Sequence, residues 1–479
     1  MKMRIILRVF PVALLILAAG AQEGARAQGH HITVKVTGWK NTRIWLGNYY
    51  GRQTYITDSA ELDGSGRALF SGKEKYPSGI YFVLMPDRHR FFQMLLGKHQ
   101  DLSVEADTSD LAAKVVYAGD PDNLLFSEYN RFLRGVDERE RQLSLELGQS
   151  HTRADSARVA QFRKDIGQEI YQYRKNFIAA HPSSLLAEIF RAMLDPEPPS
   201  VPTLPDGRKD SLFAFRYAKD HFFDGVNFSD SALLRTPIYE SRLQTYFDHF
   251  VTPFPDSINE EADRLIKRTR ANREMFKFTL WWLTYNYETS RYMGMDAVFV
   301  HLVERYYVPG DAYWLTKDQN DKIIQRAYTL AANLIGEKAP ELDLLDSSLR
   351  DHISLYGIQA RYTLVVFWDP TCGHCQVEIP EMDSAYRKSW KKMGVKVLAI
   401  RTGGTKEEWT DFIRDHDLGD WINAWDPANQ TNYRRLYDVY MTPVVYLLDR
   451  DKRILAKKLG VRELSDFLDH LSKSRKQGT

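Results

Sequence analysis

The sequence of 479 residues contains only two cysteines, Cys372 and Cys375. A disulfide framework that stabilises a fold uses several pairs at wide spacing, so this composition excludes one. A bridge across two intervening residues closes a very short loop and constrains the unfolded chain little. Redox chemistry is therefore the more economical reason for keeping the pair.

The chain also lacks an excess of either charge, because 65 Lys and Arg residues balance 63 Asp and Glu residues to a formal net charge of +2. This balance excludes a broad electrostatic attraction to nucleic acid or to an anionic membrane surface. Beyond the N-terminus no apolar run reaches the roughly 18 residues that span a bilayer, so no membrane span is expected in the mature chain. The length predicts several domains.

Residues 1–27 have the pattern of an export signal. The start is basic, with Lys2, Arg4 and Arg8. An apolar stretch from Val9 to Ala19 follows, and Ala25-Arg26-Ala27 has the small-x-small pattern of a cleavage site. We expect cleavage after Ala27 and an exported mature chain. The alternative is an uncleaved signal that tethers the protein to the membrane.

Residues 28–115 have the pattern of short strands. Ile32, Val34 and Val36 alternate with polar residues, as in a half-buried strand. Further short apolar segments follow, separated by turn signals such as Asp63-Gly64-Ser65-Gly66. This pattern predicts an N-terminal antiparallel β-sandwich.

Residues 116–330 change to a helical period. Between 157 and 177 the apolar residues fall three, four or seven apart, which is one face of an amphipathic helix. Helix is also predicted over 261–293. The Pro-rich stretch 195–207 fits neither a helix nor a central strand, so it is predicted to be a loop within a mostly helical middle domain.

Residues 336–479 alternate strand and helix patterns after a connector at 336–348. Buried strands are predicted at 362–368, 394–400 and 443–449, with a further strand and a closing helix after them. The alternation indicates an α/β sheet with an antiparallel pair late in the order. The predicted fold class is therefore a multidomain protein of α+β and α/β parts.

The motif Cys372-Gly373-His374-Cys375 lies where the first of these strands gives way to a helix. Backbone N–H groups are unpaired at a helix start, and the helix dipole adds about half a positive charge there. Both favour the thiolate, so Cys372 is the predicted nucleophile. Cys375, one turn further on, is expected to be more buried and less acidic and to resolve the mixed disulfide. A protonated His374 would further stabilise the Cys372 thiolate.

Two residues outside the motif are candidates for the same site. Glu378 lies three residues after Cys375, on the same side of the predicted helix, where a carboxylate could exchange a proton with that thiol. The alternative for Glu378 is a solvated surface side chain. Pro443 opens a predicted strand, where either a trans turn proline or a cis proline beside the redox site is compatible with the sequence.

Over about residues 336–475 these motifs resemble the TlpA/ResA-like thiol-disulfide oxidoreductases of the thioredoxin superfamily, which are similar to the AhpC/TSA redoxins. The resemblance rests on the pattern C-x-x-C-x-x-E-x-P, completed by Pro380, and on YMTPVVYLLDRD around Pro443. It implies a thioredoxin-like fold, Glu378 as a proton shuttle, and a cis Pro443 at the substrate groove. It also implies an inserted strand and helix between 400 and Met441.

The resemblance implies an enzyme that exchanges a Cys372–Cys375 dithiol or disulfide with protein or small-molecule thiols, aided by an upstream redox partner and without a cofactor or metal. Two positions depart from cytosolic thioredoxins. Val366 replaces their buried aspartate, and Thr371 replaces the tryptophan before the first cysteine. Both argue against a general reductase, and we expect a potential above the roughly −270 mV of thioredoxin.

Three other functions compete with this one. A redoxin-type thiol peroxidase would have Thr or Ser at position 369 and Pro at 365, where this chain has Asp369 and Val365. A zinc site would need four ligands, and the motif offers two sulfurs. An envelope binding or scaffold protein with a vestigial redox domain would explain why most of the chain lies outside the motif.

The first 330 residues are similar to β and helical modules that precede thioredoxin-like domains in envelope proteins of some Gram-negative bacteria. That resemblance implies a periplasmic location and carries no chemistry. The size of this portion suggests that it positions the redox domain against a partner or forms a homodimer. The sequence leaves open the substrate and the direction of electron flow.

Overall fold

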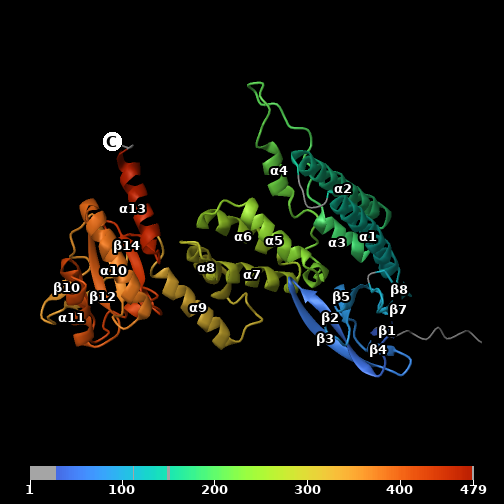
Figure 1. Cartoon of the computed structure of the whole chain (residues 1–479), viewed down its shortest axis with the longest axis horizontal. Coiled ribbons are helices and arrows are strands. Elements are labelled where there is room, and N and C mark those ends of the chain that lie inside the picture. The colour runs from blue at the N-terminus through green and yellow to red at the C-terminus, as the bar shows by residue number, and fades with distance from the viewer. Residues whose placement is uncertain (1–28, 112, 148–151, 477–479) are drawn as a thin grey trace, which may run out of the picture. The chain divides into compact units, whose positions relative to one another are not determined.

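A computed structural model describes residues 29–111, 113–147 and 152–476 (Figure 1), and the predicted signal peptide lies outside them. The chain divides into two compact units. The first extends to Leu194 and includes Arg235–Ile238; the second comprises Asp195–Leu234 and Tyr239–Thr479. The helices of the predicted middle domain are thus distributed over both units, and the predicted domain boundaries stay a prediction.

The strands of the first unit form two four-stranded sheets, in the orders β4-β1-β7-β8 and β3-β2-β5-β6. Side chains from both sheets share one buried apolar cluster, which includes Ile32 and Val34 of β1 and Ile44 of β2. The prediction of purely antiparallel pairing is wrong, because β1 pairs with β7 in parallel. The strands are β1 (His30–Thr37), β2 (Thr42–Tyr50), β3 (Gln53–Leu62), β4 (Arg67–Gly72), β5 (Gly79–Leu84), β6 (Phe91–Leu96), β7 (Asp101–Asp107) and β8 (Val115–Ala118).

Among the described residues of the first unit, three helices follow the strands: α1 (Pro121–Leu147), α2 (Arg153–Ala180) and α3 (Leu185–Met193). The apolar stripe predicted over 157–177 lies on α2, and its residue Phe177 is buried. A reciprocal capping box between Thr152 and Asp155 satisfies backbone donors at the start of α2. The helical prediction for this stretch is therefore confirmed.

The second unit begins with the Pro-rich stretch 195–207, which is non-helical as predicted. The predicted helix over 261–293 is two helices, because Asn272 caps a new one by accepting from the N–H groups of Glu274 and Met275. Within the described residues, no helix is both long and apolar enough to cross a membrane. The main helices are α4 (Phe213–His221), α5 (Ile238–His249), α6 (Pro255–Thr269), α7 (Arg273–Glu288), α8 (Asp296–Leu302) and α9 (Lys317–Ala331).

The C-terminal part of this unit, orange and red in Figure 1, contains a seven-stranded sheet in the order β10-β9-β13-β12-β11-β14-β15. The strands β11, β12 and β13 are parallel, and β14 and β15 form the predicted antiparallel pair. The predicted connector is wrong in part, because it contains β9. The strands are β9 (Asp343–Asp346), β10 (His352–Ser354), β11 (Tyr362–Trp368), β12 (Val395–Arg401), β13 (Ile422–Trp425), β14 (Val444–Leu448) and β15 (Ile454–Lys457).

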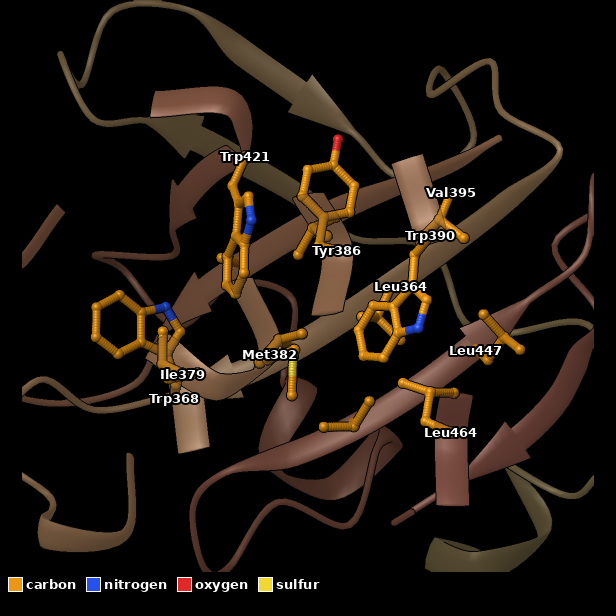
Figure 2. Close-up of a cluster of buried hydrophobic side chains, with 14 of the residues drawn as sticks. Leu364, Trp368, Ile379, Met382, Tyr386, Trp390, Val395, Trp421, Leu447 and Leu464 are labelled. Carbon is orange, nitrogen blue, oxygen red and sulfur yellow. The ribbon is translucent and has the colours of Figure 1, made fainter. Parts of the chain in front are cut away.

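The helices of this part are α10 (Gly373–Lys388), α11 (Lys406–Asp415), α12 (Tyr433–Leu436) and α13 (Val461–Lys476). One face of α10 packs on the sheet through Ile379, Met382 and Tyr386, all buried in one cluster with Trp368 of β11 (Figure 2). Because β11 is buried along its whole length and α10 is fixed by this cluster, the turn between them is held at both ends. That turn carries both cysteines.

Candidate active site

Cys372 is the N-cap residue of α10, with extended backbone angles of φ −78° and ψ 122°. Its N–H donates to the Asp369 carbonyl at 3.1 Å, and its own carbonyl accepts from the Gln376 N–H at 3.0 Å. The first bond closes the turn after β11, and the second is the first bond of the helix. This arrangement places the Cys372 side chain among the unpaired N–H groups at the helix start.

The half-buried Cys372 thiol has a pKa lowered from its usual value. The largest cause is a hydrogen bond from the Cys375 backbone N–H, followed by one with the Thr442 side chain. Burial opposes them, and the His374 backbone N–H adds a smaller contribution in the same direction as the first two. The predicted physical cause, orphan donors at a helix start, is therefore present at Sγ.

Cys375 is fully buried, and burial raises its pKa to about 12. The Asp369 N–H donates to its sulfur at 3.5 Å, which opposes the rise. The two cysteine side chains also hydrogen-bond to each other. The structure therefore brings the two sulfurs together as a dithiol with one accessible acidic thiol and one buried weakly acidic thiol.

The Thr442–Pro443 peptide bond is cis, as the resemblance implies. Thr442 lies directly against the motif, because the Cys372 thiol donates to its carbonyl oxygen at 3.4 Å. Its side chain hydrogen-bonds to both sulfurs and lowers both pKa values. Sequence reasoning singled out Pro443 and missed Thr442 as the contacting residue, although the position just before the proline was the available signal.

The remaining two candidates lie on α10 without a fixed role. The His374 side chain is exposed, and only its backbone N–H acts on Cys372. Glu378 is half-buried, three residues after Cys375. In the part of the chain that the structure describes, neither the His374 imidazole nor the Glu378 carboxylate has a hydrogen bond or an ion pair. Their chemical roles stay predictions.

Asp369 is a site residue that sequence reasoning missed. Its carboxylate accepts from the N–H of Thr371 at 2.8 Å and from the Thr371 hydroxyl at 2.7 Å, so it shapes the turn that leads to Cys372. The loop after β12 packs against this carboxylate so closely that a Cβ on Gly403 would lie 2.0 Å from Oδ2. A side chain at position 403 would therefore force the Asp369 carboxylate to shift, whereas glycine lets the loop lie against it.

Three large apolar side chains near the motif face solvent. Val377 of α10 is 60% exposed, and Tyr440 and Met441, just before Thr442, are 69% and 83% exposed. Large apolar side chains at such exposure cost free energy in water, and clusters of them on a soluble protein often mark contact sites for other molecules. Exposed apolar side chains therefore lie close in sequence to both parts of the site, on α10 and just before Thr442.

Comparison with known families assigns most of the second unit. Residues 170–329 match a family described as a domain of unknown function, DUF5106, and residues 335–463 match the AhpC/TSA family. The thiol-disulfide oxidoreductase ResA of Bacillus cereus is 27% identical over 139 residues, which is 29% of this chain and 78% of ResA.

Two solved structures are also similar to this chain. One, a domain of a possible thiol-disulfide isomerase from Cytophaga hutchinsonii, is 42% identical, covers 30% of this chain and 97% of its own, and has a TM-score of 0.28. The other, a thioredoxin-like protein from Bacteroides caccae, is 22% identical, covers 57% of this chain and 98% of its own, and has a TM-score of 0.44.

The fold and the paired thiols define a thioredoxin-like domain that carries out thiol–disulfide redox chemistry. Residues 335–463 form an AhpC/TSA-type thioredoxin-like domain by their family match, and their homologues are ResA-type thiol-disulfide oxidoreductases. The protein is accordingly an oxidoreductase of this class, with an additional DUF5106 region ahead of its redox domain.

Proposed function

We propose that the protein is an exported enzyme that exchanges its Cys372–Cys375 dithiol or disulfide with thiols or disulfides of protein or small-molecule substrates. The observation that carries the proposal is the asymmetry of the two thiols. Cys372 is accessible and has a lowered pKa, whereas Cys375 is buried and has a pKa of about 12. A nucleophile needs the first set of properties, and a resolving thiol that waits for a mixed disulfide needs the second.

In the reducing direction, the Cys372 thiolate attacks one sulfur of a substrate disulfide. The substrate S–S bond breaks, its other sulfur leaves as a thiolate that takes a proton from solvent, and a mixed disulfide forms at Cys372. Cys375 then loses its proton and attacks Cys372 Sγ. The mixed disulfide breaks, the second substrate thiolate leaves, and the pair is oxidised as the substrate gains two electrons. The same steps in reverse oxidise a substrate dithiol.

The second step needs a base, because a thiol with a pKa of about 12 carries almost no thiolate at neutral pH. We assign this role to Glu378. Its half-buried position one helical turn after Cys375 supports the assignment. The position that holds the buried acid in thioredoxins is filled here by Val366, which is fully buried in the same apolar cluster as Cys375.

The exposed apolar side chains of Val377, Tyr440 and Met441 favour a protein substrate. Their burial against an extended segment would release apolar surface from water, which contributes roughly 25 cal/mol per Å². The export signal predicted at residues 1–27 supports a periplasmic location for this exchange. A homodimer stays a prediction.

The test is capture of substrates by the full chain with Cys375→Ser, which lacks the resolving thiol. We expect Cys372 to accumulate as mixed disulfides that disappear on reduction with dithiothreitol. Cys372→Ser, with the nucleophile removed, is the matched control and should capture nothing. If Cys375→Ser also captures nothing, and the wild-type pair does not titrate as a reversible two-electron couple against glutathione, the redox function is refuted in favour of a scaffold.

A further inference from the structure

The segment that carries Thr442 to the redox site begins at a buried carboxylate. The Asp438 side chain is only 3% exposed, and it is held by two cations from different parts of the chain. Arg326 of α9 donates from both terminal nitrogens, with Nη2 at 3.3 Å from Oδ2. Lys458, just after β15, donates to Oδ2 at 2.5 Å.

Asp438 has a left-handed backbone conformation, with φ +51°. Residues other than glycine adopt this conformation at a cost in free energy, so the surrounding contacts must hold it in place. Burial would raise the pKa of the Asp438 carboxyl, but the hydrogen bonds from Arg326 and Lys458 outweigh it and lower that pKa. The carboxylate is therefore charged and paired on both sides.

Lys458 anchors the segment at its other end as well. Its backbone N–H donates to the Val445 carbonyl at 2.8 Å, while its side chain holds Asp438. Residues 438–445 are thus fixed at both ends by one residue, and Thr442 lies between those ends. Arg326 is the only partner of the Asp438 carboxylate, within the described residues, that comes from outside the thioredoxin-like domain.

A second group of contacts joins the same two regions. Asn333, which follows α9 and is fully buried, donates to the Leu436 carbonyl at 3.0 Å. Lys457 of β15 donates to the Asn333 carbonyl and side-chain oxygens, each at 2.8 Å, and pairs with Asp296 of α8. The start of α8 and the region just after α9 are therefore bonded to β15 and to the last residue of α12, all within one compact unit.

We propose that Arg326 is a positioning residue for the redox site, through which the DUF5106 region holds the Asp438–Val445 segment and so places Thr442 against Cys372. Arg326 belongs to the stretch that matches DUF5106, and Asp438 belongs to the stretch that matches the AhpC/TSA family. The inference rests on the proposed function, because it gives the helical region a part in setting the acidity of the nucleophile.

The proposal predicts a specific change on substitution of Arg326 by glutamine. Without the guanidinium, the start of the segment keeps only the Lys458 contact, so Thr442 is held less firmly against the Cys372 sulfur. Since that side chain lowers the Cys372 pKa, the pKa should rise. Loss of a hydrogen bond worth about 1 kcal/mol corresponds to about fivefold less thiolate at pH values below the pKa, and to no change well above it.

The experiment measures the rate at which iodoacetamide alkylates Cys372 as a function of pH in the full-length Cys375→Ser background. We expect Arg326→Gln to shift the profile to higher pH and to slow alkylation about fivefold at low pH. Arg326→Lys, which keeps one donor, should restore part of the rate. The matched control is Arg305→Gln, since Arg305 pairs with Asp263 inside the helical region and is 58% exposed; it should leave the profile unchanged.

If the Arg326→Gln profile coincides with the parent profile, Arg326 does not position Thr442 and the proposal is refuted. A lower melting temperature in that case would mean that Arg326 contributes only to stability. If Arg326→Gln fails to fold, Asp438→Asn is the second variant, because asparagine tolerates the left-handed conformation while losing the charge that both cations hold. The same shift is expected for it, and no shift would refute the proposal. Failure of the proposed function would be seen separately: Cys372 in the Cys375→Ser parent would then react no faster than a free thiol.

Discussion

Substitution of Thr442 by valine tests how the redox site sets the acidity of its nucleophile. Valine has nearly the shape of threonine, so the backbone carbonyl that accepts from Cys372 at 3.4 Å keeps its place while the hydroxyl is lost. The hydroxyl-bearing side chain is the second-largest cause of the lowered Cys372 pKa, after the Cys375 N–H. The variant should therefore raise that pKa.

The magnitude follows from the strength of a hydrogen bond to a charged group, about 1.5–3 kcal/mol, against about 1.4 kcal/mol for one pKa unit. Water replaces part of the loss at a half-buried sulfur, so we expect a rise of about one unit. Because the reduced form is stabilised by its thiolate, the same loss should make the disulfide less oxidising by about 30 mV for this two-electron couple.

The assay is the pH dependence of Cys372 alkylation in the Cys375→Ser background, with a glutathione redox titration of the otherwise unaltered pair. Thr442→Val should react about tenfold more slowly at pH values below the wild-type pKa and at the same rate well above both pKa values. Thr442→Ser keeps the hydroxyl and is the matched control. If the valine and serine variants have the same profile, the hydroxyl does not act on Cys372 and the reasoning is wrong.

Three further predictions concern the neighbours of this sulfur. Because pH 7 is about five units below the pKa of Cys375, almost none of that thiol is ionised. Mass spectrometry of the reduced wild type after brief alkylation should therefore find one label, on Cys372. A second label of equal yield would contradict the difference in acidity between the two thiols. Glu378→Gln should slow the resolution of a mixed disulfide by about 10²-fold while leaving the Cys372 alkylation profile unchanged, whereas Glu381→Gln, on the exposed side of α10, should do neither. Gly403→Ala should lower the free energy of unfolding by about 1–3 kcal/mol in urea denaturation, because its Cβ would overlap the Asp369 carboxylate, and Gly419→Ala, with open space around it, should cost less.

The parts of the fold that the sequence predicts well are those with a strong local pattern. The strand predicted at 362–368 is β11, and the helix predicted to follow it at the cysteine motif is α10. Strands of three or four residues, such as β10 and β13, are too short to show a recognisable alternation of apolar and polar residues. The parallel pairing of β1 with β7 joins segments far apart in the chain, and no local pattern indicates it.

The site shows the same division between local and distant information. Two cysteines at a helix start, with a proline before a later strand, are visible in the sequence because each has a distinctive local setting. Thr442 and Asp369 are not distinctive in that way, since their importance comes from contacts with the sulfurs that only folding creates. The contact between Arg326 and Asp438 spans 112 residues and two family regions, so neither region alone predicts it.

The charged contacts of α8 and α9 are better explained as fixing the position of these helices along the sheet than as adding to the free energy of unfolding. Apolar side chains of similar volume often stabilise a buried contact as well as an ion pair does, because burying charges is costly. Here burial is the largest cause that lowers the pKa of Lys457, and its pairing with Asp296 opposes that shift. A shift of α8 and α9 by one turn, about 5.4 Å, would leave Lys457 and Asp438 without these partners, at a cost of several kcal/mol. Only one placement of the helices satisfies both charges, and that placement fixes the start of the segment that holds Thr442 against the nucleophile.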